Sequence, residues 1–275
     1  MKKYYTRACN FYYGINANLL IKKKLALPLC GSNYIAFDKV EIFTRNNNKV
    51  LSNVINIKEV KDLGISCKKK VNQDLKKITL KRKNFLINVN FLETSIMGIL
   101  NLTPDSFSDG GKFNNQKKAK RHIASMIKSG ANIIDIGGES TRPGSKTVST
   151  EMEWKRIESI VKNFKKNYKK TCLSIDTRKS EIMIKGIKCG AHLINDVSGF
   201  NYENHSLSRL KKYNVVKVLH HMKGTPNTMQ KSPKYKNVLL DIYDFFENGI
   251  KKMDNRKIII DPGIGFGKNL KHNLT

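Results

Sequence analysis

From about residue 95 onward, the chain alternates short apolar runs with longer amphipathic segments. The apolar runs, predicted to be strands, lie at 96–102, 132–136, 172–176, 191–195, 215–220 and 257–261. The segments between them, predicted to be helices, lie near 115–129, 150–167, 178–188, 204–213 and 235–254. Strands that alternate with helices form parallel β-α-β units, and strands that are apolar throughout are typical of a sheet covered on both faces. The sequence therefore predicts an α/β fold built on a parallel sheet.

Each apolar run ends in a polar group. These groups are Asn101, Asp135, Asp176, Asn195-Asp196, His220-His221 and Asp261. A single polar residue at a strand end is ordinarily a turn residue. In a β/α barrel, however, the C-terminal ends of all strands surround one mouth, where active sites lie. The repeated pattern therefore predicts a polar site at one end of a barrel.

The composition changes near residue 90. Before it, short apolar runs are separated by Lys and Asn clusters, and strands are predicted at 39–44 and 50–57. No motif in this part indicates a chemistry. The sequence thus predicts two domains, an N-terminal extension over 1–94 and a barrel domain over 95–275.

Bulk composition limits the classes of partner. The net charge is +30, from 52 Lys+Arg against 22 Asp+Glu, but the lysines are scattered and no nucleic-acid-binding motif accompanies them, so no nucleic-acid partner is expected. No apolar run approaches the roughly 18 residues of a membrane span, so no membrane partner is expected either. The five cysteines are odd in number and contain no CxxC pair, which favours reduced thiols in the cytoplasm over disulfides or zinc.

Six ordered blocks carry a more specific signal. They read IMGILNLTPDSFSDGG (96–111), GANIIDIGGESTRPG (130–144), SIDT (174–177), IND (194–196), HMKGTP (221–226) and DPGIGFGK (261–268). In this order they closely resemble the motifs of the dihydropteroate synthase family, a family of pterin-binding enzymes. The resemblance covers about 95–275. Because each block alone is common, the specificity comes from their number and order.

The resemblance implies a TIM-type (β/α)8 barrel, incomplete here with about six of the eight β/α units. The family carries a Ser-Arg-Lys-Ser-like block and an Arg-x-His block on its last two strands, and no segment after Lys268 matches either. We therefore expect negligible turnover from this chain alone. One reading of residues 1–94 is a remnant of an upstream folate-pathway module.

The implied reaction joins 6-hydroxymethyl-7,8-dihydropterin diphosphate to p-aminobenzoate. It forms 7,8-dihydropteroate and diphosphate, and Mg²⁺ assists it. A homodimer is a possible assembly for such a protein. Two other interpretations remain: an inactive, non-catalytic pterin-binding fragment, and a pterin-binding barrel of the methyltransferase type.

For the pterin, the resemblance assigns Asp261, with Asp176 and Asn195 beside it. A buried carboxylate can accept paired N–H bonds from the amino-pyrimidinone edge of the ring. An ordinary alternative for Asp176 is the N-cap of the next helix, and Asp196 is interpreted as a turn residue. Three further residues are assigned to the substrate pocket, namely His221, Met222 and Phe266.

For the diphosphate, the resemblance assigns Asn101 as the Mg²⁺ ligand, because hard cations prefer oxygen donors. Thr141 and Arg142 are implied as anion contacts, with Arg142 catalytic. Asp109 is implied as a second catalytic residue, which stabilises the cation-like methylene of the pterin. Phe107 and Pro143 resemble walls of the aminobenzoate pocket. In the family, the two loops that carry these residues close over the site.

Overall fold

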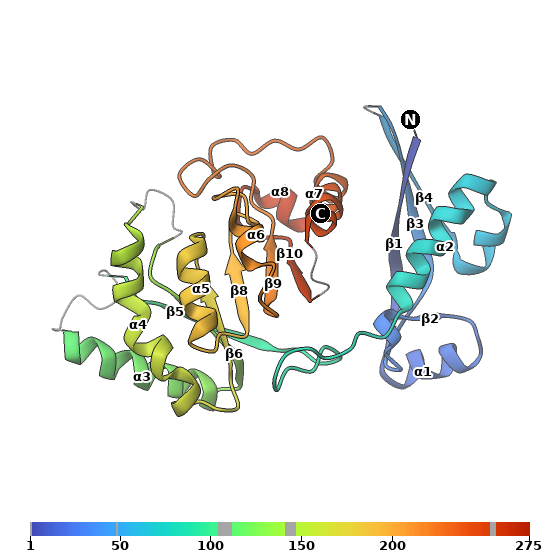
Figure 1. The fold of residues 1–275 in the computed structure, drawn as a ribbon. Coiled ribbons are helices and arrows are strands. Elements are labelled where there is room, and N and C mark those ends of the chain that lie inside the picture. Colours follow the sequence, from blue (N-terminus) through green and yellow to red (C-terminus); the bar gives the residue numbers. More distant parts are fainter. Residues whose placement is uncertain (1, 48, 104–111, 141–146, 254–256) are drawn as a thin grey trace. The chain divides into compact units, whose positions relative to one another are not determined.

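The protein forms two compact units, Met1–Lys83 and Asn84–Thr275 (Figure 1). A computed structural model describes residues 2–47, 49–103, 112–140, 147–253 and 257–275. The compact units divide at 83/84, whereas the predicted domain boundary lies at 94/95. Residues 84–94 thus belong to the C-terminal unit, for a reason that its packing makes clear below.

The N-terminal unit is an antiparallel sheet with helices packed on it. Strands β1, β2 and β4 all pair with β3, and helix α2 packs Val71 against Phe37 and Val40 of β3. The predicted strands at 39–44 and 50–57 correspond to parts of β3 and β4. The elements are β1 (Lys2–Tyr13), α1 (Gly14–Lys22), β2 (Leu27–Pro28), β3 (Ile35–Asn46), β4 (Lys49–Asn56) and α2 (Ile65–Thr79), with 3-10 turns at Leu29–Gly31 and Ile57–Asp62.

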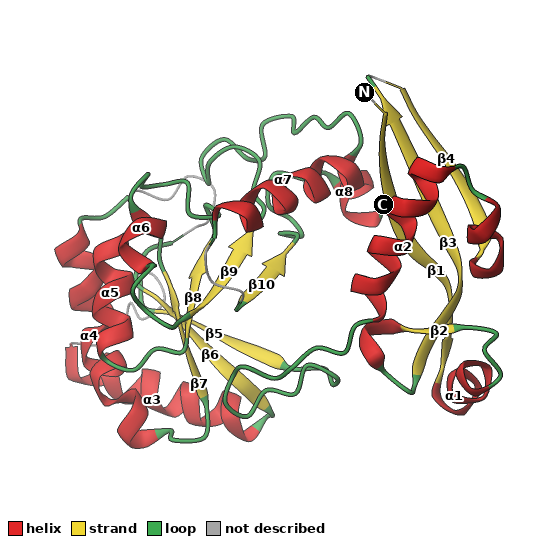
Figure 2. Ribbon diagram, turned by 45° about the vertical axis from the view of Figure 1, so that its right-hand side comes forward, coloured by secondary structure: helices red, strands yellow, loops and turns green. Residues whose placement is uncertain are grey.

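The C-terminal unit is a parallel sheet with the strand order β10-β9-β8-β7-β6-β5. Figure 2 shows the strands with helices arranged along the outside. Its strands are β5 (Ile96–Asn101), β6 (Ala131–Gly137), β7 (Cys172–Asp176), β8 (Leu193–Asp196), β9 (Val216–His220) and β10 (Ile258–Asp261). Its helices are α3 (Lys112–Lys128), α4 (Thr150–Asn167), α5 (Ser180–Lys188), α6 (Ser206–Leu210), α7 (Val238–Lys252) and α8 (Leu270–Leu274).

These elements match the predicted α/β pattern closely. Strand β7 and helix α4 have the predicted bounds, while α6 is shorter than the predicted 204–213. Helix α6 begins at Ser206, with His205 as its N-cap residue. The predicted barrel is represented, in the described residues, by six parallel strands with β5 and β10 at the two ends of the sheet.

The outer face of the parallel sheet is the main hydrophobic core. Alternate strand residues such as Ile134, Leu173 and Leu219 pack against the helices, which contribute Ile123 of α3 and Phe164 of α4 among others. Adjacent residues on a strand point to opposite faces. The residues between these core positions therefore face the inner side of the sheet.

The inner face begins with an apolar layer at the N-terminal ends of the strands. Leu86 and Val89, from the segment before β5, pack into this layer and bury it. Asn88, between them, donates a hydrogen bond to the carbonyl of Lys170 just before β7. This packing places residues 84–94 with the C-terminal unit. The strand residues of the apolar layer are Met97, Ile133, Cys172, Leu193, Val216, Val218 and Ile259.

None of the helices within the described ranges combines the length and the apolar character needed to cross a membrane.

Packing of Leu86 into the apolar layer gives the first prediction. Leu86→Ala should lower the free energy of unfolding of the C-terminal unit by about 2–4 kcal/mol, because it removes a buried side chain and leaves a cavity. The only tryptophan, Trp154, lies in α4, so its fluorescence during urea unfolding reports on this unit. Leu92→Ala is the control, since Leu92 is 42% exposed. Equal losses for both variants would contradict the packing.

Candidate active site

Above the apolar layer, the inner face of the sheet becomes polar. Four polar residues, Asp135, Ser174, Asn195 and His220, each follow a residue of the outer-face core on their strand. Because adjacent strand residues point to opposite faces, all four point inward. We refer to these four residues as the polar layer. They come from β6, β7, β8 and β9, which are adjacent in the sheet. The strand-end pattern in the sequence therefore folds into one continuous polar surface.

Asp135 and Asn195 form the centre of the polar layer. The Nδ2 of Asn195 donates to Oδ2 of Asp135 at 2.8 Å. Burial raises the pKa of Asp135, and the nearby Ser174 hydroxyl and the hydrogen bond from Asn195 act in the opposite direction. Because the amide is oriented by this bond, the Oδ1 of Asn195 is left as an acceptor for another group.

His220 connects the polar layer to Asp261 at the end of β10. Its Nδ1 lies 3.2 Å from Oδ2 of Asp261, and Oδ1 of Asp261 accepts from the backbone N–H of Gly263 at 2.8 Å. These hydrogen bonds, first that of His220, lower the pKa of Asp261 despite its partial burial. The ring of Phe266 packs edge-on against His220, with 4.8 Å between centroids. Asp261 is thus an ionised carboxylate in a fixed orientation.

Four atoms of the polar layer are buried without a hydrogen-bond partner among the described residues. They are Oδ1 of Asp135, Oγ of Ser174, Oδ1 of Asn195 and Nε2 of His220. An unpaired buried polar atom costs about 1–3 kcal/mol, so native proteins contain few of them. Four on one surface indicate a place where a polar ligand or water completes the hydrogen bonding.

Asp176 and Asn101 meet at the mouth of the site, on either side of Gly137. A Cβ added to Gly137 would lie 3.1 Å from Oδ2 of Asp176 and 3.3 Å from Oδ1 of Asn101. Burial raises the pKa of Asp176 well above its usual value, and the negative charges of Asp135 and Asp196 add to the effect. Asp176 is not the N-cap of α5, a position that Lys179 occupies. Its carboxyl is therefore available to the site.

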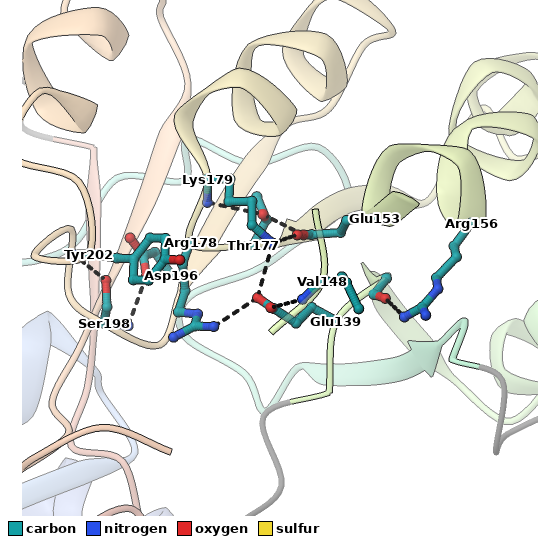
Figure 3. Close-up of polar contacts among 11 residues, drawn as sticks. Glu139, Val148, Glu153, Arg156, Thr177, Arg178, Lys179, Asp196, Ser198 and Tyr202 are labelled. Atoms are coloured by element: carbon teal, nitrogen blue, oxygen red, sulfur yellow. Dashed lines mark hydrogen bonds and ion pairs between the residues drawn. The ribbon is translucent and has the colours of Figure 1, made fainter. Parts of the chain in front are cut away.

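Behind this surface lies a buried ionic network made of Glu139, Glu153, Thr177, Arg178 and Lys179 (Figure 3). Lys179 pairs with Glu153 at 2.5 Å and with Glu139 at 3.4 Å. Arg178 pairs with Glu139 at 2.9 Å, and Thr177 donates to Glu153 at 2.6 Å. The network joins Glu139, two residues after β6, to the turn after β7 and to helix α4.

Charged side chains also bind the backbone just before and just after residues 141–146. The second carboxylate oxygen of Glu139 accepts from the backbone N–H of Val148 at 3.0 Å, and Arg156 donates to the carbonyl of Gly138 at 2.6 Å. Arg178 also stacks on Tyr202, 4.4 Å from the ring centroid (Figure 3). The described residues on both sides of this segment are therefore fixed by charged contacts.

Asp196 has the structural role that the sequence suggested. Its carboxylate accepts the backbone N–H groups of Ser198 at 2.8 Å and Phe200 at 3.1 Å, which forms the turn after β8. Burial raises its pKa to about 6, partly offset by these hydrogen bonds and by Arg178.

The sequence-assigned residues are partly brought together. Asn101, Asp176, Asn195, Asp261 and Phe266 gather at the inner face and its mouth, as described above. The structure places His220 rather than His221 beside Asp261, because β9 points alternate residues to opposite faces. Met222, which follows, is half-buried. The other assigned residues, Phe107, Asp109, Thr141, Arg142 and Pro143, lie outside the described residues.

His221 instead lies among aromatic side chains of the outer side. Its ring packs edge-on against Phe245 of α7 at 4.9 Å between centroids, and its Nδ1 lies 3.0 Å from the Nζ of Lys268. Burial, then the nearby ammonium of Lys268, lowers the pKa of His221 to about 4. His221 is thus a neutral packing residue and not a wall of the polar surface.

The sequence did not identify four residues, Asp135, Ser174, His220 and Lys268, as part of the site. Ser174 lies within a motif block, with no signal for its own role. Asp135 and His220 were visible in the strand-end pattern, but only strand register shows that they share one surface. Lys268 was visible as the last residue of a motif block, with no signal for its contacts. No cluster of three or more His, Cys, Asp or Glu side chains suited to a metal ion occurs within the described ranges.

Comparison with known proteins shows what this chain resembles. Residues 97–275 match the family model described as pterin binding enzyme. The dihydropteroate synthase of Escherichia coli (strain K12) is 43% identical over 185 residues, which cover 66% of this chain. The chain spans 65% of the length of that relative.

Solved structures give the same result for the fold. A dihydropteroate synthase of Yersinia pestis in a sulfonamide drug complex is 41% identical, with a TM-score of 0.62, covering 68% of this chain and 69% of that one. The Xanthomonas albilineans dihydropteroate synthase with 4-aminobenzoic acid is 34% identical, with a TM-score of 0.60, covering 68% and 67%. These neighbours support an α/β fold of the TIM type.

The ionic network gives the second prediction. Glu153→Gln should lower the free energy of unfolding by about 3 kcal/mol, because it leaves the buried ammonium of Lys179 without its main partner. Urea unfolding followed by far-UV circular dichroism measures the loss. Glu158→Gln, in the same helix, removes an exposed i,i+4 pair with Lys162 and should change the stability very little. A loss no larger for Glu153→Gln than for this control would show that the network does not stabilise the unit.

The neutral state of His221 gives the third prediction, on pH dependence. Its pKa is about 4 in the folded protein and about 6.5 when unfolded. Between these values the unfolded chain binds the extra proton, so the contribution of His221 to stability is complete above pH about 6.5 and falls towards pH about 4. His221→Asn, which keeps an acceptor near the position of Nδ1, should therefore lose less stability than wild type between pH 7 and pH 5 in urea unfolding. Equal losses would mean that His221 does not titrate in this way.

Proposed function

This chain belongs to the pterin-binding enzyme family, and from this premise we propose that it acts in dihydropteroate synthesis. The proposed reaction joins 6-hydroxymethyl-7,8-dihydropterin diphosphate to p-aminobenzoate, with diphosphate as the leaving group. It is a transferase reaction of folate biosynthesis. The similarity to dihydropteroate synthases from several bacteria supports the proposal.

The main support for the proposal is that the inner face of the sheet has an apolar layer and, next to it, a polar layer. A pterin is a flat ring system with an apolar face and one edge dense in N–H donors and acceptors. The apolar layer and the unpaired atoms of the polar layer match these two properties. Asp261, held ionised by His220, can accept paired N–H bonds from the ring edge, which are strong because one partner is charged.

Asp176 and Asn195 are proposed to complete the pterin contacts. The Oδ1 of Asn195 can accept from the ring, since its Nδ2 is already bonded to Asp135. Burial raises the pKa of Asp176 well above its usual value, and a carboxyl can donate as well as accept when it carries a proton. A ring edge that alternates donors and acceptors needs both kinds of partner.

A magnesium ion fits the donor set at the mouth. Asn101 offers a neutral amide oxygen beside the carboxyl of Asp176, and hard cations such as Mg²⁺ take oxygen ligands and keep several waters or phosphate oxygens. We propose that Asn101 holds the ion with the substrate's diphosphate. When bound, the ion would neutralise charge that develops on the leaving diphosphate.

The remaining contacts are proposed from the motif resemblance alone. Thr141 and Arg142 would bind the diphosphate, and Asp109 would stabilise positive charge on the pterin methylene. Phe107 and Pro143 would line the aminobenzoate pocket, next to Met222 and Phe266. A homodimer is proposed as the assembly on the same basis.

The fourth prediction tests ligand recognition by calorimetric titration of the purified chain with 6-hydroxymethyl-7,8-dihydropterin diphosphate and Mg²⁺. Asp261→Asn should weaken binding about 100-fold, because an amide cannot replace two charge-assisted hydrogen bonds of about 1.5 kcal/mol each. Glu181→Gln, an exposed carboxylate on helix α5, should bind like wild type.

Two results would contradict the proposed function. One is the absence of pterin diphosphate binding by the wild-type chain when circular dichroism shows it folded. The other is tighter binding of methyl-tetrahydrofolate than of the pterin diphosphate, which would favour the methyltransferase-type barrel.

A further inference from the structure

The loop that follows β10, residues 261–268, lies directly on the end of β9. Gly263 and Gly267 have φ of 65° and 63°, a conformation that favours glycine. A Cβ on Gly263 would lie 2.1 Å from the carbonyl oxygen of His221, and one on Gly267 would lie 2.5 Å from that of Lys223. Only glycine permits so close an approach of two backbones. The 261–268 loop and the β9 end therefore form one packed unit.

Lys268 lies at the centre of this unit. Its side chain is only 5% exposed, and its Nζ contacts acceptors from both segments. Gly263 and Phe266 of the loop offer carbonyl oxygens at 2.9 and 3.1 Å, and His221 offers Nδ1 at 3.0 Å. An ammonium has three N–H donors. Each donor thus has one near acceptor, and the carbonyl of His221 lies further away at 3.4 Å.

No carboxylate is among these acceptors, which makes the arrangement unusual for a buried lysine. Burial lowers the pKa of Lys268 to about 8, while the charge of Asp261 acts in the opposite direction. At neutral pH the side chain of Lys268 is therefore mostly in its charged, protonated form. The contact with Nδ1 also requires that His221 carry its proton on Nε2, consistent with the neutral ring described above.

The residues that Lys268 holds are in turn connected to the candidate site. The 261–268 loop begins at Asp261, whose Oδ1 accepts from Gly263, one of the residues that Lys268 holds. It also contains Phe266, whose carbonyl Lys268 holds and whose ring packs on His220. Finally, the backbone N–H of His221 donates to the carbonyl of Asp261 at 2.9 Å.

We propose that Lys268 is a positioning residue that fastens the 261–268 loop to the end of β9 and thereby sets Asp261 and Phe266 for the pterin. The identity of the ligand rests on the proposed function, whereas the fastening itself does not. Among the described residues, the hydrogen bonds of Lys268 go to His221, Gly263 and Phe266 and not to the polar layer. It acts through Gly263, Phe266 and His221.

The first arm of the test needs no ligand. In Lys268→Met, a side chain of similar length without donors, the amides of Gly263 and Phe266 should exchange hydrogen at least about tenfold faster, because the loop opens more often. The ¹⁵N shift of His221 Nδ1 should also move, since its donor is gone. Lys271→Met, an exposed lysine three residues on, is the matched control and should change neither readout.

The second arm measures binding of 6-hydroxymethyl-7,8-dihydropterin diphosphate by calorimetry, at a temperature where circular dichroism shows the variants folded. Lys268→Met should weaken binding at least about tenfold, because a misplaced carboxylate loses well-aligned hydrogen bonds. Lys268→Arg keeps the charge, but its planar fork does not fit three acceptors around one point, so its affinity should be intermediate. It also serves as the test variant if Lys268→Met does not fold.

The outcomes separate the two proposals. Unchanged affinity in a folded Lys268→Met variant, with or without lower stability, would overturn the positioning role and leave a purely structural lysine. Unchanged amide exchange and His221 shift would overturn the fastening. If the wild-type chain binds no pterin diphosphate, the proposed function fails, while exchange and the His221 shift still decide whether Lys268 fastens the loop.

Discussion

The two-residue period of buried parallel strands is the constraint on which the rest of the C-terminal unit depends. The strands bury one set of alternate residues against helices, and this set is mainly apolar, with Asp196 of β8 and Lys217 of β9 as buried exceptions. The other set then faces inward at every strand. The strand pairing is staggered, with Ser174 opposite Leu193 and Asn195 opposite Val218, so the polar residues lie progressively further along successive strands. An apolar layer sealed by Leu86 and Val89 therefore supports a polar layer above it.

This layering also explains why the unit needs buried charge. Loops leave the sheet at its polar end, and their backbones must be held close to the site. The protein does so with two buried lysines in different surroundings. Lys179 pairs with the carboxylates of Glu153 and Glu139, whereas Lys268 is surrounded by two carbonyls and an imidazole nitrogen. A full ion pair suits a permanent framework. Because the acceptors around Lys268 are neutral, Lys268 forms no ion pair with Asp261. The carboxylate of Asp261 therefore remains available to a ligand.

Much of the C-terminal unit could be predicted from sequence because its signals are local. Strand β7 and helix α4 follow from an apolar run and a capped amphipathic segment, since Ser149 caps α4 as a good N-cap residue does. The contacts of His220, His221 and Lys268 could not be predicted in this way. Two adjacent histidines at a strand end carry no sequence signal for which one faces inward, because that depends on the register of β9 with β10. Likewise, a glycine-rich loop indicates positive φ but not the backbone against which it packs.

The four unpaired atoms of the polar layer have an energetic consequence. Without water or a ligand to pair with them, these atoms would cost about 1–3 kcal/mol each, an amount comparable with the net stability of a typical domain, about 5–15 kcal/mol. A surface purely for stability would have replaced them with apolar side chains, as the layer below does. Their persistence on four adjacent strands is therefore best explained by a ligand that pairs with them. Such a ligand stabilises the folded state in proportion to its concentration above its Kd, so recognition and stability of this unit are linked through the same atoms.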